Sequence, residues 1–135
     1  MAKLPPTLLQ VWLKGSLMAL GEAASPRRAE SARLHAALYG QVAGPAALAK
    51  QVKSINNLDT LNIASELPHI QVPARVVWAE DDMLSPESGR RLAADLGAPF
   101  TLLPHAKHFT PEDHPRAIAQ AINEVVEEVQ EISRR

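Results

Sequence analysis

The stretch that decides the fold is PARVVWAEDD, which runs from Pro73 to Asp82. Its centre, Val76-Val77-Trp78, is a short apolar run of β-branched and aromatic residues, the pattern of a β-strand that is buried on both faces. Strands of this kind belong to parallel sheets, in which helices cover both faces. Three carboxylates follow the run, at positions 80–82. We therefore predict a buried parallel strand with acidic side chains in the loop after it.

The residues after this stretch repeat the alternation of strand and helix. Ser85-Pro86 combines a capping residue with proline at the first helical position, and Gly97 is placed to end that helix. Phe100 to Leu103 is a second short apolar run. The last segment carries an apolar stripe typical of an amphipathic helix, at Ile118, Ile122, Val125, Val129 and Ile132. Residues 70 to 132 thus predict two parallel strands joined by a crossover helix and followed by a second helix.

A sheet of two parallel strands is incomplete. Parallel sheets normally contain several strands with both faces covered, so this pair should have an open edge at which another strand belongs. The uncovered edge and the apolar stripe of the last helix favour association with a second copy of the chain or with a different chain.

The residues before Pro68 predict helices and no strand. The helical segments are Pro5 to Gly21, Ser25-Pro26 to Gly40, Gly44-Pro45 toward Asn56-Asn57, and Asp59 to Glu66, the last ending before Pro68. We therefore expect an α/β fold with a helical segment at residues 1–67, followed by a strand-helix-strand-helix unit with parallel strands at residues 68–135.

Charge and composition narrow the class of protein. The net charge of −1, from 14 basic and 15 acidic residues with no basic block, argues against nucleic acid or an anionic membrane as a partner. The absence of cysteine excludes disulfides and thiolate metal sites. No apolar run reaches the roughly 20 residues of a membrane helix, and Gln10 and Lys14 interrupt the segment that most resembles a signal peptide. We expect a cytoplasmic protein whose partner is a small apolar molecule.

Two loops follow the two predicted strands and carry the residues suited to chemistry. The first holds Asp82, and the second, residues 104–115, holds three histidines including His108. The first loop also carries Glu80 and Asp81. Because the carboxyl ends of parallel strands meet at one edge of a sheet, a carboxylate of the first loop and a histidine of the second should lie side by side. A carboxylate beside an imidazole fixes its tautomer and lets the other ring nitrogen take a proton, as in acid–histidine catalytic pairs. Taken singly, the acid is better explained as a solvated residue near the start of the Ser85 helix, and His108 as a loop histidine bonded to backbone.

From about Leu58 to Val129 the sequence resembles the α/β-hydrolases. Trp78-Ala79-Glu80-Asp81-Asp82 is similar to the loop that carries the acid of their catalytic triad, and Leu103-Pro104-His105-Ala106-Lys107-His108-Phe109 is similar to the loop that carries the histidine. The resemblance implies that Asp82 and His108 are the catalytic acid and histidine, and that the helical residues 1–67 correspond to the cap of such enzymes. Ala79 and Lys107 depart from it, since both stand where glycine is commonest.

The third member of the triad is missing from the sequence. The family's nucleophile elbow reads G-x-S-x-G, on a strand-to-helix turn before the acid and the histidine. No such motif occurs, and Ser16, in the nearest glycine–serine pair, lies within a helical pattern. The loop that normally forms the oxyanion hole is missing as well.

A metal site is an alternative use of the second loop. Nitrogen and oxygen ligands are dense there, at His105, His108, Glu112, Asp113 and His114. The spacing of these residues is not a zinc signature, and H-E-x-x-H is absent. We expect neither a metal nor a cofactor, and we interpret Thr110, Pro111 and Asp113 as capping the last helix and Glu112 and His114 as solvated.

Two hypotheses remain open. In the first, the chain is the C-terminal part of an α/β-hydrolase that cleaves an ester, epoxide, halide or carbon–carbon bond, and a nucleophile outside the chain, on a complementing half, completes the triad. In the second, it is a non-catalytic remnant that binds an apolar ligand or self-associates through the open sheet edge.

Overall fold

The computed structural model describes residues 5–21, 27–40, 43–56 and 58–135. Its helical half contains α1 (Pro6–Ser16), the π-helical turn η1 (Leu17–Gly21), α2 (Arg28–Ala37), η2 (Leu38–Gly40), α3 (Gly44–Ser54), α4 (Leu58–Ile63) and the 3₁₀ helix η3 (Ala64–His69). Its sheet half contains β1 (Val76–Ala79), α5 (Pro86–Asp95), β2 (Phe100–Leu103), α6 (Thr110–Asp113) and α7 (Pro115–Ser133). The expected mixture of helices with two parallel strands is confirmed.

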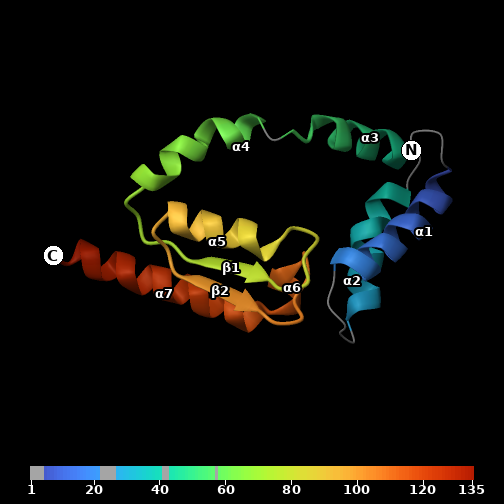
Figure 1. The fold of residues 1–135 in the computed structure, drawn as a ribbon. Coiled ribbons are helices and arrows are strands. Elements are labelled where there is room, and N and C mark those ends of the chain that lie inside the picture. The colour runs from blue at the N-terminus through green and yellow to red at the C-terminus, as the bar shows by residue number, and fades with distance from the viewer. Residues whose placement is uncertain (1–4, 22–26, 41–42, 57) are drawn as a thin grey trace.

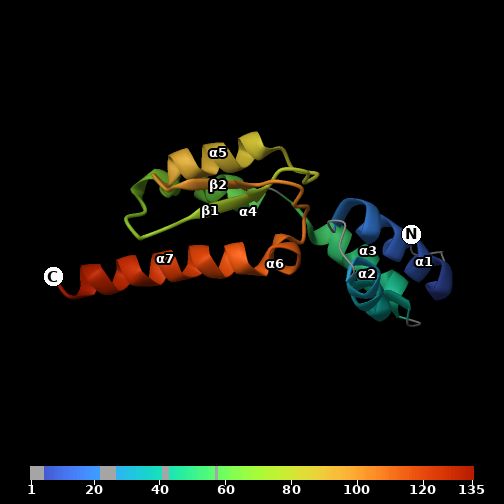
Figure 2. The same cartoon turned by 90° about the horizontal axis from the view of Figure 1, so that it is seen from below.

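The strands form where the two apolar runs predict them. β1 and β2 are parallel neighbours, in register from Val76 opposite Phe100 to Ala79 opposite Leu103. α5 covers one face of the sheet and α7 the other, so the sheet half has three layers (Figures 1 and 2). The helices α1, α2 and α3 lie beyond the carboxyl ends of both strands (Figure 1). The loops that follow the strands therefore lie between the two halves.

The helix α5 begins and ends as its sequence predicts. Ser85 caps it by accepting a hydrogen bond from the backbone N–H of Glu87 at 3.3 Å, and Pro86 follows at the first helical position. Gly97 ends it in the left-handed conformation, at φ 60°. Gly89 lies against the indole of Trp78, so that a Cβ at this position would come within 2.5 Å of the ring. Glycine thus allows α5 to approach β1 closely.

The outer edge of β1 is open in the described part of the chain, where the sheet has two strands. The N–H groups of Val76 and Glu80 bond to Pro99 and Leu103, both at 3.0 Å. In a parallel pair alternate residues face the neighbour, so Val77 and Ala79 direct their backbone polar groups away from β2. A groove of about 380 Å³ lies between β1 and α7, lined by Arg75, Val77, Ile118, Ala121, Ile122, Val125 and Val126.

The stripe of α7 is only partly covered. Ile118 and Val125 are half-buried, whereas Ile122, Val129 and Ile132 are 58%, 44% and 56% exposed. The buried cluster beside the helix is small and contains Ala79, Leu103 and Ala106, with Val77 and Ala117 packed against it. The chain therefore leaves apolar surface uncovered along the same side as the open edge.

The helical half agrees with the sequence in kind but not in every boundary. Leu9 is fully buried beside Ala32 and Ala36, so α1 and α2 pack together. Ser25-Pro26 lies outside the described residues. The helix predicted to stop before Pro68 ends as α4 at Ile63, and η3 continues through Pro68. The fixed φ of proline suits a 3₁₀ turn, although one hydrogen bond is lost there.

The last helix also differs from its prediction. His114, at φ −129° and ψ 54°, separates the single turn α6 from α7, so Thr110 and Asp113 do not cap one continuous helix. Thr110 lies within α6, and its hydroxyl donates to the carbonyl of Lys107 at 2.9 Å. Among the helices formed by described residues, none is long and apolar enough to cross a membrane.

Candidate active site

The loops after β1 and β2 are tied to one another. We call residues 80–85 the acid loop and residues 104–109 the histidine loop. Beyond the end of the sheet, Asp81 donates its backbone N–H to the carbonyl of Ala106 at 3.0 Å. The parallel pairing thereby continues into the loops and places them side by side at the carboxyl edge of the sheet. The sequence predicted this arrangement from the order of the strands.

Asp82 and His108 meet at this edge. The Nδ1 atom of His108 lies 3.1 Å from Oδ1 and 3.3 Å from Oδ2 of Asp82. The Asp82 side chain is 10% exposed and that of His108 is 43% exposed. A carboxylate accepts hydrogen bonds, so this contact favours the tautomer in which Nδ1 carries the proton and Nε2 keeps its lone pair. The pair is thus arranged to accept a proton at Nε2.

A residue of the acid loop itself orients the carboxylate of Asp82. Its Oδ1 accepts the backbone N–H of Leu84 at 3.1 Å, and the Leu84 carbonyl accepts the indole N–H of Trp78 at 3.2 Å. Trp78 belongs to β1 and packs against α5. The orientation of the acid is therefore coupled to the packing of the sheet half.

The helical half contacts the histidine loop through Phe109. The ring of Phe109 stacks on His35 of α2 with centroids 4.6 Å apart and contacts the His108 ring edge-on at 5.7 Å. Its backbone N–H donates to the carbonyl of Gly21 at 2.7 Å, and Lys107 donates to the carbonyl of Ala19. The residue after His108 thus joins the two halves.

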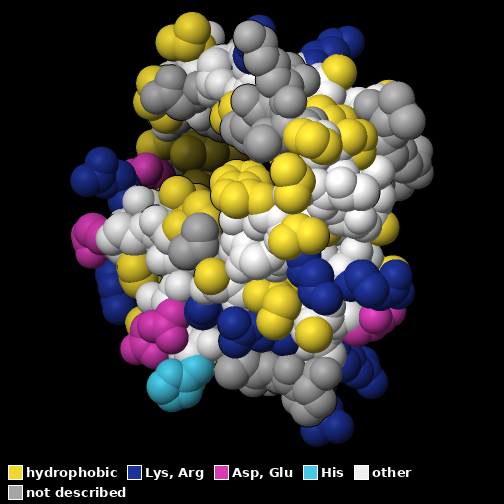
Figure 3. All heavy atoms as spheres, turned by 90° about the vertical axis from the view of Figure 1, so that its right-hand side faces the viewer, with side chains coloured by type: hydrophobic (Ala, Val, Ile, Leu, Met, Phe, Trp, Pro, Cys, Tyr) yellow, Lys and Arg dark blue, Asp and Glu magenta, His cyan; other side chains and the backbone are white. Residues whose placement is uncertain are grey.

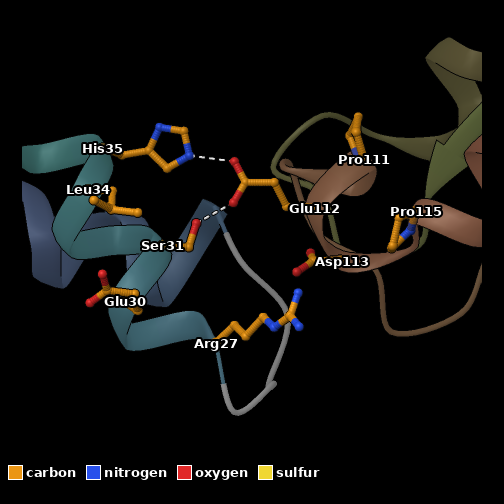
Figure 4. A pocket seen from close by; sticks show the side chains of 9 residues that line it. All are labelled: Arg27, Glu30, Ser31, Leu34, His35, Pro111, Glu112, Asp113 and Pro115. Carbon is orange, nitrogen blue, oxygen red and sulfur yellow. Dashed lines mark hydrogen bonds and ion pairs between the residues drawn. The ribbon is translucent and has the colours of Figure 1, made fainter.

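Glu112 forms a second junction, which the sequence did not predict. Its carboxylate accepts the hydroxyl of Ser31 and lies 2.6 Å from Nε2 of His35, so Ser31, His35 and Glu112 form a cluster between α2 and α6 (Figure 4). Glu112 is exposed, as expected, with its side chain 44% exposed, but it also has these two partners. The four-residue spacing of Ser31 and His35 places both on one helix face, but nothing local indicates which acid they meet. A cleft of about 690 Å³ runs beside the cluster.

The Glu112 cluster makes the junction sensitive to pH. The Ser31 hydroxyl, and to a smaller extent His35, lower the pKa of the Glu112 carboxyl below its ordinary value of 4.5, against the opposing effect of burial. A carboxyl whose pKa is lower in the folded state stabilises that state above its unfolded pKa. This stabilisation is lost as the pH falls through 4.5 toward the lowered value.

We expect acid pH to lower the free energy of unfolding by up to about 1 kcal/mol through the Glu112 carboxyl. The effect is this small because Glu112 and His35 are partly exposed. Glu112→Gln should abolish that part of the pH dependence, and Glu131→Gln, on the exposed side of α7, should not. Denaturant unfolding at neutral and acid pH measures both. An unchanged pH dependence in Glu112→Gln would contradict the assignment.

An apolar cavity of about 520 Å³ lies in the helical half and reaches the histidine loop. Its lining consists of Leu13, Leu17, Leu34, His35, Tyr39, Leu48 and Phe109. Viewed from the helical end, the molecule gathers hydrophobic side chains on a hollowed face (Figure 3). Of the neighbouring apolar residues of α1 and η1, Leu13 and Leu17 line the cavity, whereas Trp12 is 54% exposed and Met18 is half-buried outside the lining.

The remaining candidates are not brought together. Within the described ranges, no group of three or more histidine, aspartate or glutamate side chains could hold a metal ion, so the ligand set of the metal alternative does not assemble. His105 and His108 follow β2, and Glu112 turns to α2. Ser16 is the last residue of α1.

Comparisons of this chain with protein-family models, with curated proteins and with solved structures find no match.

Proposed function

We propose that this chain is the C-terminal portion of an α/β-hydrolase that acts on a small, largely apolar substrate in the cytoplasm. Asp82 orients His108, and His108 activates a nucleophile that lies outside the chain. The bond that is cleaved is that of an ester, an epoxide or a halide, or a carbon–carbon bond.

The contact between Asp82 and Nδ1 of His108 carries this proposal. An acid that is largely shielded from water and accepts a backbone N–H stays oriented, while the more exposed imidazole remains accessible. Both residues follow parallel strands, at the sheet edge where α/β folds place their functional groups. The distance and the topology support an acid–base pair more strongly than two independent surface residues.

The apolar cavity supports the substrate class. It shares Phe109 with the histidine loop, and Phe109 contacts the ring of His108. A ligand in this cavity would be surrounded by leucine side chains. It would also contact Phe109, whose ring lies against the imidazole of His108. Binding energy from such contacts is apolar, which suits a small uncharged molecule.

The open edge of β1 supports a nucleophile on a further strand. A strand that pairs in parallel with the outward N–H and C=O groups of Val77 and Ala79 would end at the same edge as β1. A turn after that strand would then lie beside the acid loop, at the same sheet edge as His108. The same strand and its helix would cover the groove between β1 and α7.

The DNA directly upstream of this sequence tests the proposal. We expect it to encode, in frame, a strand followed by G-x-S-x-G or by the same turn with aspartate or cysteine at its centre. Sequencing of the upstream region measures this. A stop codon or an unrelated sequence in that frame would contradict a single-chain hydrolase and favour the second hypothesis.

A second candidate function is self-association or ligand binding without catalysis. The observation in its favour is the uncovered groove at the β1 edge together with the exposed Ile122, Val129 and Ile132 of α7. Contiguous apolar surface beside unpaired strand groups is typical of an interface. In this function Asp82 and His108 would have no catalytic role.

A further inference from the structure

Glu80, the first residue after β1, reaches across to the histidine loop. Its Oε2 accepts the backbone N–H of His105 at 3.2 Å. His105 has a φ of 59° and is the one non-glycine residue with positive φ among the described residues. The left-handed conformation is disfavoured for residues that carry a Cβ, so a contact that holds it is needed. The hydrogen bond that His105 donates to Glu80 supplies such a contact.

The conformation of His105 determines where the rest of the histidine loop goes. After it, the carbonyl of Ala106 turns back to accept Asp81, and the Ala106 side chain is fully buried. His108 follows two residues later and faces Asp82. If His105 relaxed to a right-handed or extended backbone, Ala106 would leave its position and the imidazole would move away from the acid.

We propose that Glu80 is a positioning residue for His108. Its carboxylate holds His105 in the left-handed conformation, and the loop then sets Nδ1 of His108 against Asp82. The catalytic consequence rests on the proposed function, whereas the structural step does not. An ionised carboxylate suits this task because it binds an N–H group more strongly than a neutral acceptor does.

The test measures the tautomer of His108 rather than turnover. In the full 135-residue chain, the ¹⁵N shifts of the ring show whether Nδ1 or Nε2 carries the proton, at about pH 9, where imidazoles are neutral. We expect Glu80→Ala to lower the ratio of Nδ1–H to Nε2–H tautomers by about fivefold or more, because a charge-assisted hydrogen bond is lost. Glu80→Gln keeps an acceptor oxygen and should change the ratio less than about twofold. Asp81→Ala, which removes an exposed carboxylate from the same loop, is the matched control and should leave it unchanged.

A rescue separates this role from general loss of structure. Glycine adopts the left-handed backbone without steric cost, so His105→Gly should restore the tautomer ratio in Glu80→Ala to within about twofold of the unaltered chain. An unchanged ratio in Glu80→Ala would overturn the proposal. Failure of His105→Gly to restore it would do so too, whether the double variant keeps its helical circular dichroism or unfolds.

The outcome is independent of the hydrolase assignment. If the upstream DNA encodes no nucleophile but Glu80→Ala behaves as stated, the proposed function fails and the positioning role stands. If the nucleophile is found and the tautomer does not respond to Glu80, the positioning role alone fails.

Discussion

His108→Ala is expected to lower kcat by about 10⁴-fold in a chain that also contains the upstream nucleophile. In the proposed function, the contact of Nδ1 of His108 with Asp82 at 3.1 Å would leave Nε2 to take the proton of the nucleophile and later to return it to the leaving group. Without the imidazole, neither transfer has a partner. Initial rates on a small activated ester measure the loss.

Asp82→Asn should cost about as much in the same chain. The amide preserves the shape of the side chain, but it can offer an N–H to Nδ1 and so stabilise the wrong tautomer of His108. His69→Ala, which removes an exposed histidine at the end of η3, is the matched control and should leave the rate within about twofold. The 135-residue chain by itself should show no rate that depends on His108. A clear rate that His108→Ala abolishes in this short chain would mean that the nucleophile lies within it.

Gly89→Ala is expected to lower the free energy of unfolding by about 1–3 kcal/mol. The added methyl group would lie 2.5 Å from the base of the Trp78 indole, which cannot rotate freely because its N–H is bonded to Leu84. Either α5 or the indole must move. Because Leu84 also donates to Asp82, the displacement should reach the acid loop.

Gly15→Ala is the matched control for this effect. Gly15 also lies in a helix, α1, but a Cβ there meets nothing within 4 Å. Alanine favours helices by up to about 1 kcal/mol over glycine, so this variant should be as stable as the unaltered chain or more stable. Urea unfolding followed by circular dichroism compares the two. Equal free energies of unfolding for Gly89→Ala and Gly15→Ala would show that the close approach of α5 to Trp78 does not affect stability.

The local pattern of the sequence was enough to predict the sheet half. The apolar runs at Val76–Ala79 and Phe100–Leu103 form the predicted parallel strands, although both are only partly buried. The segment between them carries its own cap and stop signals. Parallel strands bring their carboxyl ends to one edge, so the meeting of the two loops followed from chain order. The resemblance to the α/β-hydrolases then selected Asp82 and His108 from the three acids and three histidines that these loops carry.

Contacts between distant segments could not be predicted in this way. Glu112 binds Ser31 and His35 across 81 and 77 positions of the chain, and the apolar cavity forms where α1, α2 and α3 meet Phe109. These pairings depend on how the helical half sits on the carboxyl edge of the sheet, which amphipathic patterns do not specify. The left-handed backbone of His105 was equally invisible, because the acceptor that holds it, Glu80, lies 25 positions earlier. The sequence by itself therefore determined the strands, their direction and the meeting of the acid loop with the histidine loop, since these follow from local periodicity and topology. Only the tertiary structure decided what surrounds that pair, because packing between the halves joins residues that have no local signal in common.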